Sequence, residues 1–173
     1  AHRTAGAAGE LAVGNGVTIC DIDSGIDVFH PMFFRADGGF SSFVDVDDNG
    51  FLDPGVDAVL IDGVEVTLRR LNGVVIDRYT GLPLFDTDDP TLDLRYDYLY
   101  ADLDGSGLRE FGPDGGFTEA TPTYGEPLFV ADDVNDDGEL EVGERLVALG
   151  TSKIKAFRWD GEIYERGEDL IEA

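Results

Sequence analysis

The residues best suited to chemistry lie in one acidic stretch of twelve positions, residues 133–144. Oxygen-bearing side chains occupy positions 1, 3, 5, 9 and 12, while Gly138 is sixth and an apolar residue is eighth. Ca²⁺ takes about six to eight oxygen ligands, and this spacing wraps them around one ion while the glycine makes a sharp turn. We predict a Ca²⁺ site whose ligands are Asp133, Asn135, Asp137, Glu139 (through its backbone carbonyl), Glu141 and Glu144.

Two further stretches repeat this pattern incompletely. Each has oxygen ligands at positions 1, 3, 5 and 9 and a glycine at position 6, but neither has an acid at position 12. Both have an acid at position 13 instead, which predicts a related loop with a shifted closing ligand. All three stretches resemble the EF-hand loop, although residues 126–130 do not look helical. The candidate ligands are Asp45, Asp47, Asn49, Asp53 and Asp57 in the first stretch, and Asp102, Asp104, Ser106, Glu110 and Asp114 in the second.

Acidic residues dominate the middle of the chain. In residues 37–149, 27 acids and 6 arginines leave a net charge of −21, and the whole chain carries −25. A compact fold with this much like charge repels itself unless cations bind. Bound Ca²⁺ would relieve the repulsion, and the alternative is an acidic surface of the halophile type. The further acids of residues 86–93 have no ligand spacing, which predicts a solvated loop.

The same charge balance excludes several classes of function. No basic patch is present to neutralise phosphates, so nucleic acid and an anionic membrane surface are excluded as partners. The longest apolar runs are too short to span a bilayer. The single cysteine, Cys20, permits neither an internal disulfide nor a cysteine metal site. We expect a monomer.

Strands joined by tight turns must hold the acidic loops in place. From residue 56 to residue 79, apolar β-branched runs are separated by Asp62-Gly63 and Asn72-Gly73. Such pairs supply the positive φ angles of a type I′ turn and predict hairpins. Residues 152–159 and 162–164 flank Asp160-Gly161 in the same way and predict a last hairpin.

A different motif occurs near the N-terminus. A predicted strand, residues 17–22, leads to Asp23-Ser24-Gly25 and then to His30-Pro31. This segment resembles the aspartate segment of subtilisin-like serine peptidases, and residues 41–44 are similar to the strand that follows it. The resemblance implies that Asp23 is the catalytic aspartate, which accepts the Nδ1 proton of a histidine, and that His30 is structural. Asp21 and Met32 depart from the family pattern, which has an aliphatic residue and commonly an aspartate at these places.

The other members of a catalytic triad are missing from the sequence. His2 and His30 are the only histidines, and neither lies in a His-Gly-Thr-like segment. Gly150-Thr151-Ser152 imitates the serine motif, but an apparent strand follows it where a helix is required. We therefore interpret the chain as an N-terminal fragment of a secreted serine endopeptidase, inactive alone, whose substrate is a protein or peptide.

The resemblance also implies the architecture. It predicts an α/β fold in which residues 1–44 begin a parallel sheet, followed by a β-rich Ca²⁺-binding insertion in residues 45–151. Residues 152–173 would form a terminal hairpin leading back to the peptidase core, and helices would be few. No charged segment followed by an apolar one opens the chain, so we expect the signal peptide to lie outside it.

Two other functions stay open. The chain can be a non-enzymatic extracellular Ca²⁺-binding module for adhesion or assembly, in which Asp-Ser-Gly only closes a strand. It can also be a dimeric aspartic peptidase, in which two Asp23 carboxylates share a proton. A parallel sheet with Asp23 at its carboxyl edge favours the serine peptidase, and an all-antiparallel fold favours the module.

Overall fold

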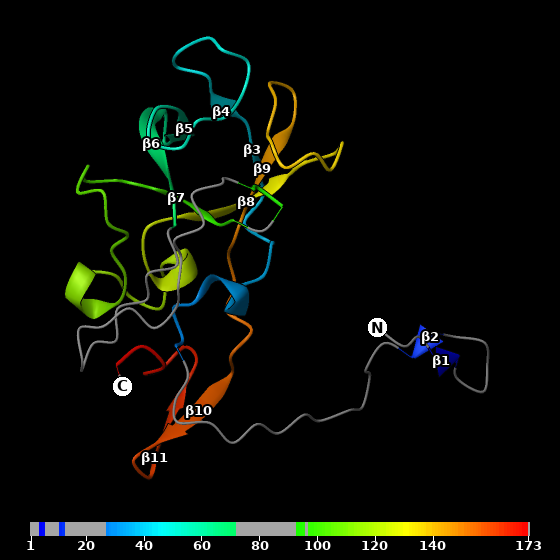
Figure 1. Ribbon diagram of the computed structural model, residues 1–173. Helices are drawn as coiled ribbons and strands as arrows, with labels where there is room; N and C mark the ends of the chain where they lie inside the picture. The colour runs from blue at the N-terminus through cyan, green and yellow to red at the C-terminus, as the bar shows by residue number, and fades with distance from the viewer. Residues whose placement is uncertain (1–3, 6–10, 13–26, 72–92, 96, 173) are drawn as a thin grey trace.

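The structure is a computed structural model that describes residues 4–5, 11–12, 27–71, 93–95 and 97–172. The described residues contain no α-helix, only three short 3-10 turns and strands joined by loops (Figure 1). The turns are η1 (Pro31–Phe33), η2 (Pro113–Gly115) and η3 (Pro122–Tyr124). The strands are β1 (Thr4–Ala5), β2 (Leu11–Ala12), β3 (Phe40–Ser41), β4 (Phe43–Val44), β5 (Ala58–Ile61), β6 (Val64–Arg70), β7 (Leu99–Ala101), β8 (Leu128–Asp132), β9 (Arg145–Ala148), β10 (Ala156–Trp159) and β11 (Glu162–Glu165).

Seven of these strands form one antiparallel sheet in the order β3-β9-β8-β7-β6-β5-β4. Its two end strands, β3 and β4, are separated in sequence by Ser42 alone, so the sheet curls almost into a closed barrel. Near closure leaves few unpaired strand edges, which is the usual solution for an all-β domain. Strands β1 and β2 pair with each other, as do β10 and β11.

The predicted α/β fold with a parallel start is therefore wrong for the described residues. Strands of a parallel pair need a crossover connection of about a dozen residues or more, usually a helix. Here most consecutive strands of the barrel are joined by tight turns or by the acidic loops, which reverse the chain and give antiparallel neighbours. The predicted strand at residues 17–22 and Asp23 lie outside the described residues.

The hairpin predictions that fall on described residues are confirmed. Strands β5 and β6 meet at Asp62 (φ 51°) and Gly63 (φ 82°), and β10 and β11 meet at Asp160 (φ 45°) and Gly161 (φ 90°). Two successive positive φ angles are those of the predicted type I′ turn, whose twist matches that of the flanking strands. The run predicted at residues 74–79 lies outside the described residues.

Two clusters of buried apolar side chains form the core. One lies within the barrel sheet and includes Leu68, Leu99 and Phe129. The other includes Val28, Phe34, Tyr124, Leu128, Leu149, Ile154 and Leu170. This second cluster joins residues from both sides of the segment boundaries expected at 44/45 and 151/152, so described residues of all three expected segments pack together in it.

Asp37 ties the start of this fold to its end. Its Oδ1 accepts the backbone N–H of Thr151 at 2.8 Å, and that hydrogen bond lowers the pKa of the Asp37 carboxyl. A lowered folded-state pKa means that ionised Asp37 stabilises the fold above its unfolded pKa of about 3.9 and that this contribution is lost as the pH falls further.

We expect Asp37→Asn to lower the urea midpoint of unfolding at pH 7, with a smaller difference from the wild type at pH 3. Urea titrations of both proteins at the two pH values measure this. A difference that grows on acidification would contradict the role given to the carboxylate.

Candidate metal centres

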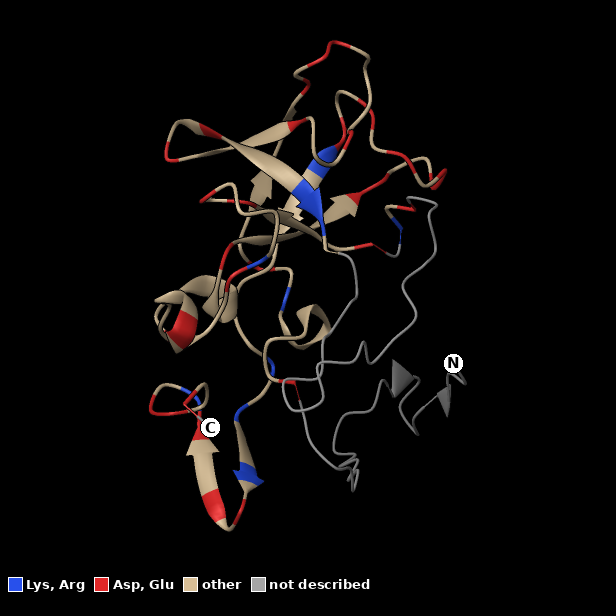
Figure 2. Ribbon diagram, turned by 60° about the vertical axis from the view of Figure 1, so that its left-hand side comes forward, with Lys and Arg blue, Asp and Glu red and all other residues tan. Residues whose placement is uncertain are grey.

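The three predicted acidic loops all begin where a strand of the barrel ends. Asp45 follows β4, Asp102 follows β7 and Asp133 follows β8. In Figure 2 many of the acidic residues, coloured red along the ribbon, lie in loops at the ends of strands. The sheet therefore holds the two ends of each loop at a fixed separation, which is what a preformed cation site needs.

Site 1, the loop of residues 45–57, is organised by its first and last carboxylates. Asp45 accepts the N–H of Asn49 at 3.2 Å and that of Gly50 at 2.8 Å. Asp57, which is fully buried, accepts the N–H of Val46 at 2.8 Å and that of Asp53 at 2.7 Å. Carboxylate oxygens of Asp45, Asp47 and Asp57 lie within 4.8 Å of one another and could hold a metal ion.

Site 3, the loop of residues 133–144, repeats these hydrogen bonds at the same positions. Asp133 accepts the N–H of Gly138 at 2.8 Å. Glu144 accepts the N–H of Val134 at 2.8 Å and that of Glu141 at 3.0 Å, which are again the second and ninth positions. Among the described residues, however, this loop does not bring three carboxylates as close together as site 1 does.

Site 2, the loop that begins at Asp102, has the same plan but a different closing residue. Asp102 accepts the N–H of Gly107 at 3.1 Å. Glu126 accepts the N–H of Leu103 at 2.6 Å and that of Glu110 at 3.0 Å, the second and ninth positions of this loop. The place that the sequence pattern assigned to Asp114 is thus taken by Glu126, and Asp114 lies exposed in η2.

One buried carboxylate oxygen of site 2 favours a bound cation. Asp102 is 4% exposed, and its Oδ1 has no hydrogen-bond partner among the described residues. Its other oxygen accepts the Nε–H of Arg69 at 2.5 Å. Oxygens of Asp102, Asp104 and Glu126 lie within 4.8 Å of one another and could hold a metal ion. Because a buried carboxylate oxygen without a partner is costly, a cation fits these residues well.

The electrostatics of the first two sites also favour a cation. The pKa of Asp47 is raised, mainly by partial desolvation, which outweighs a hydrogen bond from Asn49 that lowers it, and the charges of Asp57, Asp53 and Asp45 raise it further. Burial likewise raises the pKa of Glu126, against the effect of its two backbone hydrogen bonds, whereas the backbone hydrogen bond from Ser106 lowers the pKa of Asp104. At site 3 the N–H of Gly138 lowers the pKa of Asp133. Raised carboxyl pKa values mean that the anions are crowded or poorly solvated, and a bound cation would relieve both conditions.

The remaining predicted ligands lie within the described loops, and none of them accepts the N–H groups of the second and ninth positions as the closing carboxylates do. The amide of Asn49 donates to Asp53 at 2.5 Å and to Asp47 at 3.3 Å, and that of Asn135 donates to Asp137 at 2.8 Å. Asp104 accepts the N–H of Ser106 at 2.8 Å. Glu110, Glu139 and Glu141 are exposed.

Sites 1 and 3 contact each other through their backbones. The N–H of Leu52 donates to the carbonyl of Leu140 at 2.8 Å, and the N–H of Val142 donates to the carbonyl of Gly50 at 3.0 Å. Leu52 and Leu140 are the eighth residues of their loops, and both side chains are buried in the same core cluster. The two loops are thus fixed to the barrel and to one another.

We expect Leu140→Ala to destabilise the protein by about 2–4 kcal/mol, because it leaves a cavity under two loops at once. Val142→Ala, an exposed apolar position of the same loop, should change stability by less than about 0.5 kcal/mol. Urea unfolding of the two variants measures the difference. Equal effects would mean that the eighth residue does not anchor its loop.

A fourth acidic pair has the same closing geometry. The N–H of Asp93 donates to Asp97 at 2.8 Å, and the N–H of Asp97 donates to the carbonyl of Asp93 at 2.9 Å. Asp53 and Asp57 are related in the same way at site 1. Of the solvated loop predicted at residues 86–93, only Asp93 lies within the described residues. The sequence analysis missed this closed turn, although Asp93 and Asp97 have the same four-residue spacing as Asp53 and Asp57.

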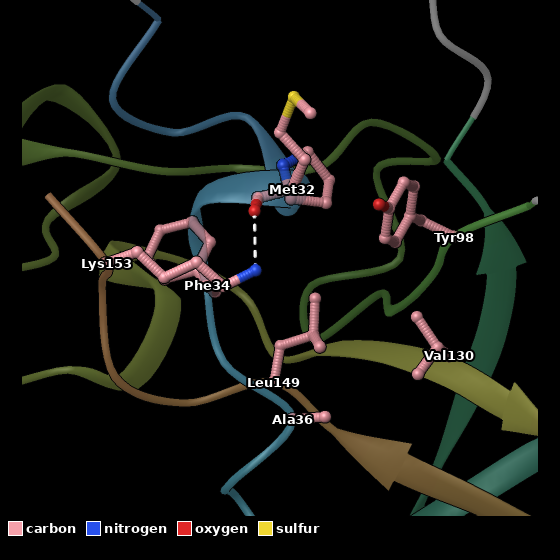
Figure 3. A pocket seen from close by; sticks show the side chains of 8 residues that line it. Met32, Phe34, Ala36, Tyr98, Val130, Leu149 and Lys153 are labelled. Atoms are coloured by element: carbon pink, nitrogen blue, oxygen red, sulfur yellow. Dashed lines mark hydrogen bonds between the residues drawn. The ribbon is translucent and has the colours of Figure 1, made fainter. Parts of the chain in front are cut away.

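Ser152, the serine of the Gly-Thr-Ser sequence that is similar to the catalytic motif, has a structural role. Ser152 is buried, and its Oγ accepts the N–H of Ile154 at 3.2 Å. The adjacent pocket is lined mainly by apolar side chains, among them Phe34, Tyr98 and Leu149 (Figure 3). Its one charged residue, Lys153, donates from Nζ to the carbonyl of Met32 at 2.8 Å. The lining that the structure describes contains no carboxylate and no histidine beside Lys153.

Comparison with protein-family models, with curated proteins and with solved structures finds no match to the chain. Among the described residues, no helix has the length and apolar character needed to cross a bilayer.

Proposed function

We propose that the chain is an extracellular Ca²⁺-binding module, in which cations held by the acidic loops stabilise a β-barrel. The observation that carries the proposal is the buried Oδ1 of Asp102, which accepts no hydrogen bond from the part of the chain that the structure describes and lies beside the carboxylates of Asp104 and Glu126. The repeated hydrogen-bond plan of the three loops supports it, because in each loop the backbone N–H groups fix the carboxylates that would face the ion.

The ligand chemistry favours Ca²⁺ over other cations. The candidate ligands are oxygens of carboxylates, amides, a hydroxyl and carbonyls, without the sulfur or imidazole that Zn²⁺ and Cu²⁺ prefer. Mg²⁺ demands a small, near-octahedral shell and gives up water reluctantly, whereas Ca²⁺ tolerates an irregular loop with many oxygens. Ca²⁺ is also abundant outside cells, where sites of modest affinity are filled.

Isothermal titration of the chain with Ca²⁺ and with Mg²⁺ tests this proposal. We expect Ca²⁺ to bind at site 2 and Asp102→Asn to remove that binding event. Asp160→Asn, which removes the same charge in the β10–β11 turn, should leave the titration unchanged. Loss of binding in both variants would indicate only a diffuse attraction to the acidic surface, and no heat from Ca²⁺ with the wild type would contradict the proposal.

A second candidate function rests on residues 17–31, which resemble the aspartate segment of subtilisin-like peptidases. In that case the module is an insertion carried by a secreted serine endopeptidase, and Asp23 is the catalytic aspartate. The place of His30 agrees with a structural role, since its Nδ1 accepts the N–H of Met32 at 3.2 Å and caps η1.

Hydrolysis of a peptide substrate distinguishes the two candidates. If the peptidase interpretation is right, the chain alone is inactive, and a longer chain that supplies a histidine and a serine segment is active and loses activity in Asp23→Asn. If flanking sequence encodes no such segments, the second candidate falls and the binding module stands alone.

A further inference from the structure

Site 2 differs from the other sites because its closing ligand is separated from the rest of the loop by a long segment of the chain. The loop reaches its ninth position at Glu110, and the closing carboxylate follows only at Glu126, after η2 and η3. The N–H of Glu126 also donates to the carbonyl of Glu110 at 2.9 Å. A cation bound here therefore holds together the two ends of the segment formed by residues 110–126.

Arg109 occupies the eighth position of this loop, where the other loops have a buried leucine. Its Nε donates to the carbonyl of Glu126 at 3.1 Å, and its Nη2 donates to the carbonyl of Thr123 at 3.0 Å. Burial lowers its pKa to about 10, while the charges of Glu126 and Asp27 act in the opposite direction. Arg109 thus connects the closing ligand of site 2 with Thr123 in η3.

The segment of residues 110–126 packs against the residues that follow Asp27. The ring of Phe111 lies 4.8 Å from that of Phe29, centroid to centroid. Gly112 approaches Phe29 so closely that a Cβ on Gly112 would lie 3.0 Å from the edge of the ring. The N–H of Gly112 donates to the carbonyl of Tyr124 at 2.7 Å, which links this contact to the residues next to Glu126.

We propose that Glu126 is the closing ligand of a divalent-cation site formed with Asp102 and Asp104, and that the cation bound there holds residues 109–126 against residues 27–34. The inference rests on the proposed Ca²⁺ binding and deepens it by naming the ligand set and the segment that it positions. The buried Oδ1 of Asp102, which has no partner among the described residues, indicates the ion. In the sequence, residues 27–34 follow the Asp-Ser-Gly motif of residues 23–25 after Ile26.

Hydrogen exchange of the whole chain, in saturating Ca²⁺ and in a chelator, tests the inference. The amides of His30, Phe33 and Phe34 donate hydrogen bonds within residues 27–34 and report on that segment. We expect Ca²⁺ to slow their exchange by about tenfold in the wild type and by clearly less in Glu126→Gln at the same Ca²⁺ concentration. Asp57→Asn removes the corresponding ligand of site 1 and serves as the control. In this variant Ca²⁺ should still slow exchange at residues 27–34, because site 1 is distant from Glu126. Site 1 contacts site 3, and site 3 lies at the opposite end of β8 from Glu126.

Phe111→Ala keeps the inference testable if Glu126→Gln fails to fold. This variant should retain Ca²⁺ binding at site 2 but lose the slowing at residues 27–34, because the ligands are intact while the contact with Phe29 is gone. If Ca²⁺ binds through Asp102 and Glu126 but exchange at residues 27–34 does not change, the inference is overturned and the proposed function stands. If Ca²⁺ does not bind the wild type at all, both are overturned.

Discussion

Removal of Ca²⁺ should lower the melting temperature of this protein by about 10–20 °C. A ligand at about one hundred times its Kd adds about 2.7 kcal/mol of stability per site, and two sites therefore add about 5 kcal/mol. For a domain of this size each kcal/mol shifts the melting temperature by about 2–4 °C. Bound Ca²⁺ stabilises the fold because the chain carries a net charge of −25 and has closely spaced carboxylates in its loops, which repel one another without a cation.

Scanning calorimetry in Ca²⁺ and in a chelator measures this shift, with Ca²⁺-saturated chelator as the control. Added NaCl separates the two explanations of the acidic composition. If the acids form only a halophile-type surface, high NaCl should restore the melting temperature in the chelator, since screening acts on all exposed charges. Equal melting temperatures with Ca²⁺ and with chelator would contradict a cation-stabilised barrel.

The second large effect is expected at Glu126. Glu126→Gln should weaken Ca²⁺ binding at site 2 by about 10–100-fold, or about 1.4–2.8 kcal/mol, because it replaces a buried anionic ligand by a neutral amide. Asp114→Asn removes one charge from the residue that the loop spacing had indicated and should leave the affinity within about twofold.

Titration calorimetry of these two variants therefore compares the ligand assigned by geometry with the one assigned by spacing. The effect on Asp114→Asn should be small because Asp114 lies exposed in η2, whereas Glu126 is buried and accepts two N–H groups of the loop. A large loss in Asp114→Asn with none in Glu126→Gln would reverse the assignment.

Local patterns in the sequence predicted the local structure well. Asp62-Gly63 and Asp160-Gly161 each adopt two positive φ angles and join antiparallel strands, because glycine and aspartate accept that conformation readily. The loop that begins at Asp133 closes on itself through hydrogen bonds to Asp133 and Glu144, because these residues lie within twelve consecutive positions, and its predicted Ca²⁺ site stays a prediction.

Features that depend on distant residues could not be predicted in this way. Glu126 is separated from Glu110 by η2 and η3, so no fixed spacing identifies it. One sequence signal could identify the closing carboxylate of each loop, which stands no more than two positions before the next strand of the barrel. The three residues concerned are Asp57, Glu126 and Glu144. Topology was also missed, because the resemblance in residues 17–31 implied a parallel sheet, whereas the described strands pair antiparallel throughout.

The central claim is that the acidic loops bind Ca²⁺ stoichiometrically. Native mass spectrometry of the chain in Ca²⁺ counts the bound ions directly. We predict at least two Ca²⁺ ions per chain, with one fewer in Asp102→Asn and one fewer in Asp57→Asn, and an unchanged number in Asp160→Asn. A wild-type chain that carries no Ca²⁺, or a count that falls equally in all three variants, would contradict the claim.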